Sequence, residues 1–148
     1  KKLRKKKLDK YIIAHIEKQR MFLGICVGFQ LMFSESEESK NIDGLNIFNG
    51  KIEKLDKFIK TVPNIGWHNV AISKSKFLDN KSKNTFYFAH SYGLVGNSQK
   101  NYSSSITLNS KKIITSIEKN NIFGVQFHPE KSAKSGIKLL NNFCSYKI

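Results

Sequence analysis

The segment Gly24-Ile-Cys-Val-Gly28 constrains the fold of this chain more than any other part of its sequence. It follows the apolar stretch 21–25, which suits a buried parallel strand, and it precedes the apolar stretch 31–33, which suits a helix. A strand that turns directly into a helix strains the backbone at the turn. Side chains two residues before and after the turn would collide, which favours glycine at both sites. The segment therefore predicts a strand, a sharp turn at Cys26 and a helix.

A cysteine at such a turn can act as a nucleophile. Gly-x-Cys-x-Gly has the form of a nucleophile elbow, with Cys where hydrolases often carry Ser. The start of the following helix would favour the thiolate of Cys26, and the backbone N–H of Val27 would be an oxyanion donor. Most lone buried cysteines are small hydrophobic residues, and Cys144, in a C-terminal helical pattern, is interpreted that way.

A second apolar run, at 122–127, ends in His128-Pro-Glu130. Pro129 removes a backbone donor and stiffens the turn between the histidine and the carboxylate. A nucleophile at the end of one strand, with a base and its orienting carboxylate at the end of another, predicts a Cys-His-Glu triad. Of the remaining histidines, His15 lies in a Lys-rich helical pattern, and His68 and His90 follow strand-like runs.

These segments resemble the class I glutamine amidotransferases, whose elbow reads Gly-x-Cys-x-Gly-x-Gln and whose His-Pro-Glu completes the triad. Within that family the sequence is most similar to the HisH group, the glutaminase subunits of imidazole glycerol phosphate synthase. The resemblance implies an α/β fold with a mostly parallel open sheet flanked by helices. The further segments that carry it are 34–38, 44–50, 62–67, 87–92 and 124–132.

The resemblance implies a role for each matching residue. Cys26 would attack the side-chain amide of L-glutamine, His128 would be the general base and then the acid, and Glu130 would orient His128. The residues expected to hold glutamine are Val27, Gln30, Glu38, Ser91 and Tyr92. The residues expected to face a partner subunit are Trp67, Tyr87 and Lys131. Two alternatives stay open, namely that Trp67 is a core aromatic and that Glu38 belongs to a solvated acidic loop.

The implied partner is a HisF-like (β/α)8 synthase subunit, in a heterodimer that makes imidazole glycerol phosphate for histidine biosynthesis. Two departures from the group's pattern, Asn64 and His68, fall near the expected partner face. They keep open a paralogous amidotransferase that supplies ammonia for surface-sugar modification. A non-catalytic interaction subunit is a further alternative, against which the intact triad argues.

The chain begins at Lys1 inside a helical pattern. In the family, strands of the sheet and a Gly-rich loop with a second oxyanion donor precede this point. We therefore expect a single glutamine amidotransferase domain over 1–148 that lacks its N-terminal part.

Composition narrows the functional classes. The formal charge of +15 would suit nucleic-acid binding, but 24 of the 26 basic residues are lysine and only Arg4 and Arg20 are arginine. Arginine is preferred for bidentate recognition of bases and phosphates, so we expect no specific nucleic-acid partner. Two cysteines, one in a catalytic setting, indicate a reducing cytoplasm. No run is long enough to span a membrane, and no motif calls for a metal or another cofactor.

The patterning predicts helices near 1–19, from 27, and over 132–146. Ser132 would be the N-cap of the last helix, with Ile137, Leu140 and Phe143 as its buried stripe. The predicted strands lie near 21–26, 45–55, 67–73, 84–90, 92–96, 103–108, 112–117 and 122–127. The predicted loops are 34–43, 74–83 and 97–101.

Overall fold

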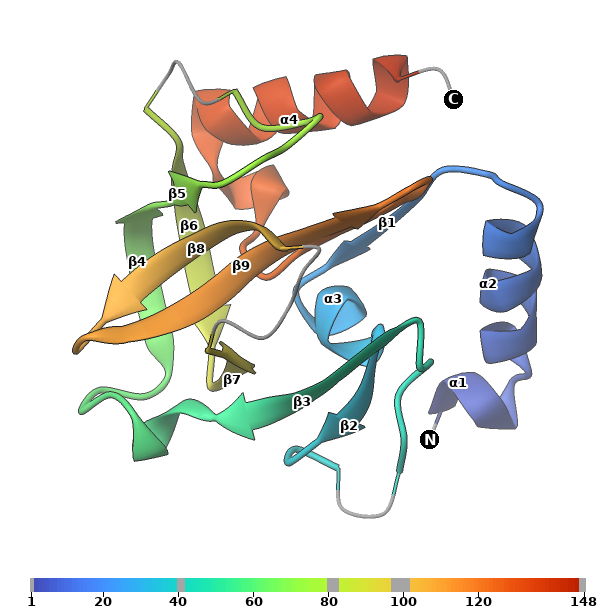
Figure 1. Cartoon of the computed structure of the whole chain (residues 1–148), viewed down its shortest axis with the longest axis horizontal. Helices are drawn as coiled ribbons and strands as arrows, with labels where there is room; N and C mark the ends of the chain where they lie inside the picture. The colour runs from blue at the N-terminus through green and yellow to red at the C-terminus, as the bar shows by residue number, and fades with distance from the viewer. Residues whose placement is uncertain (1, 40–41, 80–82, 97–101, 147–148) are drawn as a thin grey trace.

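A mixed sheet with helices at its sides forms the body of the molecule in the computed structural model, which describes residues 2–39, 42–79, 83–96 and 102–146 (Figure 1). The strands are β1 (Phe22–Ile25), β2 (Phe33–Ser36), β3 (Phe48–Lys54), β4 (Asn64–Asn69), β5 (Ala71–Ile72), β6 (Thr85–His90), β7 (Tyr92–Val95), β8 (Tyr102–Leu108), β9 (Lys111–Lys119) and β10 (Ile122–Val125). The helices are α1 (Lys2–Lys5), α2 (Leu8–Glu17), α3 (Val27–Leu31) and α4 (Ala133–Ser145), with single 3-10 turns η1 (Leu55–Lys57) and η2 (Pro129–Lys131).

The predicted α/β class is confirmed, with a sheet in which antiparallel pairs outnumber parallel ones. The strand order is β1-β10-β9-β7-β3-β2, β8 pairs with β9 and β5, and β4 and β6 form a separate two-stranded sheet. Only β1–β10 and β2–β3 are parallel among the described strands. The reason is local, because two-residue connections at 109–110 and 120–121 join β8 to β9 and β9 to β10. Connections this short permit only antiparallel pairing.

Several predicted boundaries need correction. The single helix expected over 1–19 is two helices, because Lys7 adopts a left-handed conformation with φ of 56°. The loop expected over 34–43 begins inside β2, which pairs with β3. The strand expected at 67–73 begins at Asn64 and is divided into β4 and β5. The segment 97–101, predicted to be a loop, lies outside the described residues.

Two predictions of exposure or burial are also wrong. Phe77 and Leu78, in the predicted loop 74–83, are buried in the core beneath α4. On α4 itself, Ile137 is 61% exposed, while Leu139 is 1% exposed. Helix α4 is rotated this way because it approaches η2 through Gly136, where a Cβ atom would lie 1.8 Å from the carbonyl oxygen of Pro129.

The predicted strand-turn-helix is present, and helix α3 lies unusually close to strands β1 and β10. Gly24 and Gly124 are direct partners in the β1–β10 ladder. A Cβ atom on Gly24 would lie 2.5 Å from Met32 Cε, and one on Gly124 would lie 2.8 Å from Met32 Sδ and 2.9 Å from Phe29. At Gly28 a Cβ atom would meet nothing within 4 Å. The steric need for glycine therefore holds at Gly24, and the same expectation for Gly28 is wrong.

We expect Gly124→Ala to lower the free energy of unfolding by about 1–3 kcal/mol, because the new methyl group overpacks a filled core. Gly28→Ala is the matched control. It adds the same atom in a helix with free space, so stability should stay equal or rise slightly. Urea denaturation followed by circular dichroism measures both. Equal losses in the two variants would contradict the packing argument.

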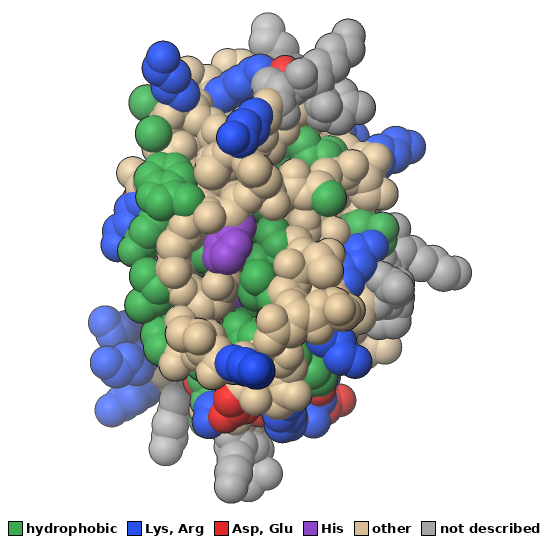
Figure 2. Space-filling view, turned by 90° about the vertical axis from the view of Figure 1, so that its left-hand side faces the viewer, with side chains coloured by type: hydrophobic (Ala, Val, Ile, Leu, Met, Phe, Trp, Pro, Cys, Tyr) green, Lys and Arg blue, Asp and Glu red, His purple; other side chains and the backbone are tan. Residues whose placement is uncertain are grey.

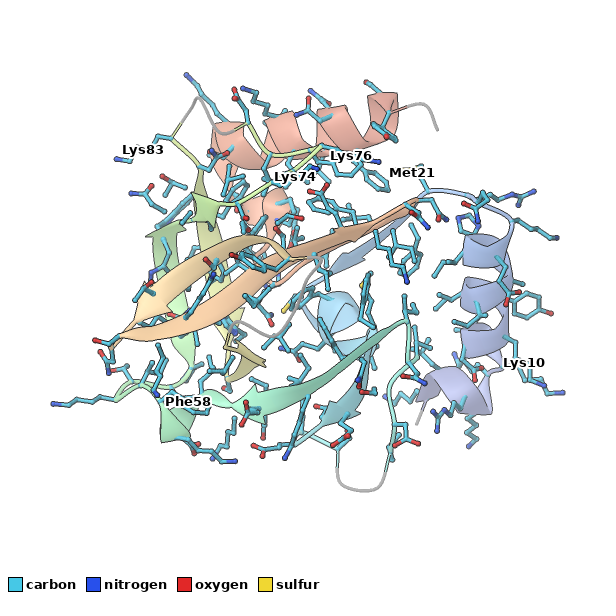
Figure 3. All side chains as sticks on the ribbon, viewed as in Figure 1. Lys10, Met21, Phe58, Lys74, Lys76 and Lys83 are labelled. Atoms are coloured by element: carbon cyan, nitrogen blue, oxygen red, sulfur yellow. The ribbon has the colours of Figure 1, made fainter. Side chains whose placement is uncertain are left out.

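The basic side chains are spread over the molecule. Figure 3 shows Lys10 on α2 at one end, with Lys74, Lys76 and Lys83 near α4 at another. Lys76 is held in place, since its Nζ donates to the hydroxyl of Tyr146 on the C-terminal side of α4 at 3.0 Å.

No helix in the described parts of the chain is long and apolar enough to cross a membrane.

Candidate active site

Cys26 and the segment that carries His128 leave the sheet at the same edge. Strands β1 and β10 are parallel, with Ile25 opposite Val125 at their carboxyl ends. The backbone N–H of Cys26 then donates to the carbonyl of Val125 at 2.8 Å. Cys26 has φ of 50° and ψ of −105°, which is the strained conformation expected of an elbow. The fold thus brings the end of residues 21–26 beside residues 126–130.

His128 and Glu130 form a hydrogen-bonded pair. The Nδ1 atom of His128 lies 2.7 Å from Oε1 of Glu130, with the two side chains 19% and 50% exposed. A carboxylate accepts hydrogen bonds, so Nδ1 carries the proton and Nε2 is left with its lone pair for a base's work. In the described part of the chain no hydrogen bond joins Cys26 to His128, and the sulfur instead accepts one from Gln126.

Ser132 fixes the turn that carries the histidine. Its hydroxyl donates to the carbonyl of His128 at 2.5 Å and accepts from the backbone N–H of Tyr87 at 2.9 Å. The backbone N–H of His128 donates to the carbonyl of Tyr87, also at 2.9 Å. Ser132 is the N-cap residue of α4, as predicted, but its side chain makes no capping hydrogen bond and anchors the His-Pro-Glu turn to β6 instead.

Burial governs the ionisation of the nucleophile candidate. It raises the pKa of the Cys26 thiol above its ordinary value, because a thiolate loses solvation there. The backbone N–H of Val27 opposes this rise, the charges of Glu130 and Glu38 add to it, and a hydrogen bond from Gln126 opposes it weakly. The thiolate-favouring start of α3 expected from the sequence is therefore outweighed, and Cys26 is a protonated thiol near neutral pH in this state.

The residues expected to hold glutamine lie on or beside helix α3. Val27, Gln30 and Glu38 line one cavity beside α3. Gln30 is buried, and its Nε2 donates to the carbonyl of Tyr92 at 2.8 Å, which brings the β6–β7 junction with Ser91 against α3. Glu38 is exposed, and its charge reaches the sulfur of Cys26. Its exposure agrees with the solvated-loop interpretation, and its role in binding glutamine stays a prediction.

Two buried residues of the site escaped the sequence analysis. Gln126 is fully buried, and its Nε2 lies 3.7 Å from the sulfur of Cys26. His90 is 5% exposed and donates from Nδ1 to the carbonyl of Tyr92 at 2.8 Å. A signal was present for Gln126, because it is a polar residue inside an otherwise apolar run that leads to His128. His90 carried no such signal, because aromatic strand residues precede it.

The two departures from the HisH pattern are partners of each other. Nε2 of His68 lies 2.9 Å from Oδ1 of Asn64, and Nδ2 of Asn64 lies 3.0 Å from Nε2 of His90. Burial lowers the pKa of His90 to about 4. The backbone hydrogen bond to Tyr92 opposes this shift, while the charges of His68 and His128 add to it. His90 is therefore a neutral, hydrogen-bonded residue at physiological pH.

The strand pair β4–β6 presents an apolar surface next to this network. Trp67 and Ile65, on one face of β4, are 53% and 59% exposed. The rings of Trp67 and Tyr87 meet edge to face, with centroids 5.8 Å apart. The alternative that Trp67 is a core aromatic is thus wrong. Figure 2 views the molecule from this side and shows hydrophobic side chains around a histidine, with charged side chains toward the edges. Lys131 is exposed on η2.

Comparison with known proteins shows which family the chain belongs to. The sequence profile described as "Glutamine amidotransferase class-I" matches residues 4–146. The chain belongs to the class I glutamine amidotransferase family. It is 39% identical to "Imidazole glycerol phosphate synthase subunit HisH" of Chlorobaculum tepidum, over 97% of this chain and 73% of that protein. It is 47% identical to the protein of the same name from Pyrococcus furiosus, over 89% of this chain and 68% of that one.

Solved structures agree on the fold. The structure titled "Structure of PurLQS from Thermotoga maritima" superposes with a TM-score of 0.72 at 18% identity, covering 95% of this chain and 68% of that one. The amidotransferase chain holds no group of His, Cys, Asp or Glu side chains, within its described residues, that could bind a metal ion.

The burial of His90 predicts a pH dependence of stability for this amidotransferase. Between pH 6.5 and about 4 the unfolded chain binds a proton on His90 that the folded chain does not. Its contribution to stability is therefore intact above pH 6.5 and is lost as pH falls toward 4, by about 3 kcal/mol. His90→Gln should remove that part of the slope in urea denaturation at stepped pH. The surface variant Tyr11→Gln should keep the wild-type slope, and a parallel slope in His90→Gln would refute the assignment.

Proposed function

We propose that this chain is the glutaminase part of an imidazole glycerol phosphate synthase. It would hydrolyse L-glutamine and pass the ammonia to a HisF-like (β/α)8 synthase subunit in histidine biosynthesis, in the cytoplasm. One observation carries the proposal. The His128–Glu130 pair, at 2.7 Å, follows the strand that is paired in parallel with the strand ending at Cys26. The identities of 39% and 47% to HisH proteins support the choice of acceptor pathway.

The chemistry assigned to the triad balances in two stages. The Cys26 proton passes to Nε2 of His128 as the sulfur attacks the side-chain amide carbon of glutamine, and Val27 N–H donates to the oxyanion. The C–N bond then breaks, His128 returns a proton to the nitrogen, and ammonia leaves a γ-glutamyl thioester. Water attacks the thioester with His128 as base, the C–S bond breaks, and glutamate and the thiol are released. Glu130 stabilises the imidazolium formed in each stage.

The polar groups near Cys26 suggest how each end of the glutamine substrate would be bound. Both N–H groups of the Gln30 amide are engaged by Tyr92 and Gln126, so only its Oε1 can accept a hydrogen bond from glutamine. The exposed carboxylate of Glu38 is suited to the α-ammonium group of the substrate. Ser91 and Tyr92, held against Gln30, are assigned to the α-carboxylate side.

The apolar surface of Ile65 and Trp67 on β4 is assigned to the synthase partner, together with Tyr87 and Lys131. Large exposed aromatics anchor interfaces, and Trp67 is supported by its edge-to-face contact with Tyr87. The backbone of Tyr87 is hydrogen-bonded to His128 and to Ser132. Docking on this surface would therefore act on the turn that carries the base.

We expect Cys26→Ser, in the complex with the synthase, to abolish glutamine-dependent synthesis and to preserve synthesis from ammonium salts, since acceptor chemistry belongs to the partner. His128→Ala should lose about 10²–10⁴-fold of the glutamine-dependent rate. Cys144→Ser is the matched control, because Cys144 is exposed on α4, contrary to its predicted burial, and should leave the rate unchanged. Residual glutamine turnover in Cys26→Ser comparable to wild type would reject the proposed function.

Trp67→Ala should weaken the complex by about 2 kcal/mol or more, roughly thirtyfold in Kd, because a central aromatic anchor is lost. Alkylation of Cys26 should be nearly unchanged, since it needs no partner. Ile137→Ala is the control, because Ile137 is a similarly exposed apolar residue on α4. Titration calorimetry against the synthase subunit measures Kd. Identical Kd values for the two variants would exclude β4 from the interface.

A further inference from the structure

We infer that Gln126 is a catalytic hydrogen-bond donor to the Cys26 sulfur, and that Gln30 and the carbonyl of Tyr92 position it. The inference rests on the proposed role of Cys26 as nucleophile. It assigns a task to a residue that the triad does not include. Gln126 is fully buried at the point where the chain leaves β10, between Val125 of the sheet and His128.

One backbone carbonyl sets the direction of the hydrogen bonds. The oxygen of Tyr92 can only accept, and it lies 2.8 Å from Nε2 of Gln30. Gln30 is thereby held with its amide nitrogen toward Gln126, where it donates to Oε1 at 2.9 Å. With Oε1 occupied, Gln126 must present its own Nε2 to the other side. That side is the sulfur of Cys26, at 3.7 Å.

The same carbonyl anchors a second branch. Nδ1 of His90 donates to the oxygen of Tyr92, so the neutral ring can only accept at Nε2, where Nδ2 of Asn64 lies 3.0 Å away. Asn64 in turn accepts from His68 at 2.9 Å. The His90 branch holds the carbonyl of Tyr92 in place, so the orientation of Gln126 is fixed from two elements, β6 and α3.

The functional consequence concerns the charge on sulfur. A donor held toward the sulfur favours the thiolate over the thiol, and likewise the negative charge that returns to sulfur when the thioester breaks. The site needs such a donor, because burial and the charges of Glu38 and Glu130 all oppose a thiolate at Cys26. The only other donor that reaches the sulfur in the described structure is the N–H of Val27, which the oxyanion requires during attack. Gln126 would stay on the sulfur through both stages.

The test is the pH dependence of iodoacetamide alkylation of Cys26 in a Cys144→Ser background, which removes the exposed thiol. Gln126→Met keeps length and removes the donor. We expect the pH of half-maximal alkylation to rise by about one, a roughly tenfold slower reaction at lower pH. Asn121→Leu is the matched control. It removes another buried side-chain amide, which donates to the carbonyls of Ile16 and Arg20 at the opposite end of β10 from Gln126, and should leave the profile unchanged.

A second measurement does not depend on a core variant folding. In the wild-type chain, the side-chain amide resonances of Gln126 should shift with the pH that ionises Cys26, and this shift should vanish in Cys26→Ala. Three results would each overturn the inference: an unchanged alkylation profile in Gln126→Met, an equal change in Asn121→Leu, or Gln126 amide resonances that do not respond to the ionisation of Cys26. A different result would reject the proposed function, namely glutamine turnover in the Cys26→Ser variant comparable to that of the wild type.

Discussion

The close contact between helix α3 and the paired glycines of β1 and β10 sets the geometry of the candidate site. Gly24 and Gly124 face each other across the ladder, and Met32 and Phe29 fill the space that their side chains would take. This contact brings the start of α3 down onto the sheet edge and forces the backbone of Cys26 into its strained turn. A sulfur held this way cannot retreat from the residues at the end of β10.

The groups around the sulfur of Cys26 have opposing effects on the pKa of its thiol. Burial and two carboxylates disfavour a thiolate, while the N–H groups of Val27 and Gln126 favour it. The result in this state is a protonated thiol at Cys26. The hydrogen bond from His128 to Glu130 sets the tautomer of His128 in the absence of a ligand. These two states are the ones that the proposed roles of Cys26 as nucleophile and His128 as base require.

The surface expected to meet a partner is mechanically connected to this site. Tyr87 contacts Trp67 through its ring and binds the His128 turn through its backbone. On the same two strands, Asn64, His68 and His90 form the branch that ends at the carbonyl of Tyr92. Two connections thus run from β4–β6 toward the candidate site. Pairing β4 with β6 is what brings them together.

The elbow at Cys26 and the His-Pro-Glu turn could be predicted from the sequence, because each is a local pattern in which a short run of residues dictates backbone and chemistry. The α/β class was implied by the resemblance to the class I glutamine amidotransferases, which these runs carry. The mixed sheet, the exposure of Trp67, and the rotation of α4 that exposes Ile137 and buries Leu139 depend on packing between distant segments. So do the contact of Gln126 with Cys26, 100 positions away along the chain, and that of His90 with Asn64, 26 positions away. Such contacts depend on which strands pair, and strand pairing is a property of the whole sheet that no local run of residues encodes.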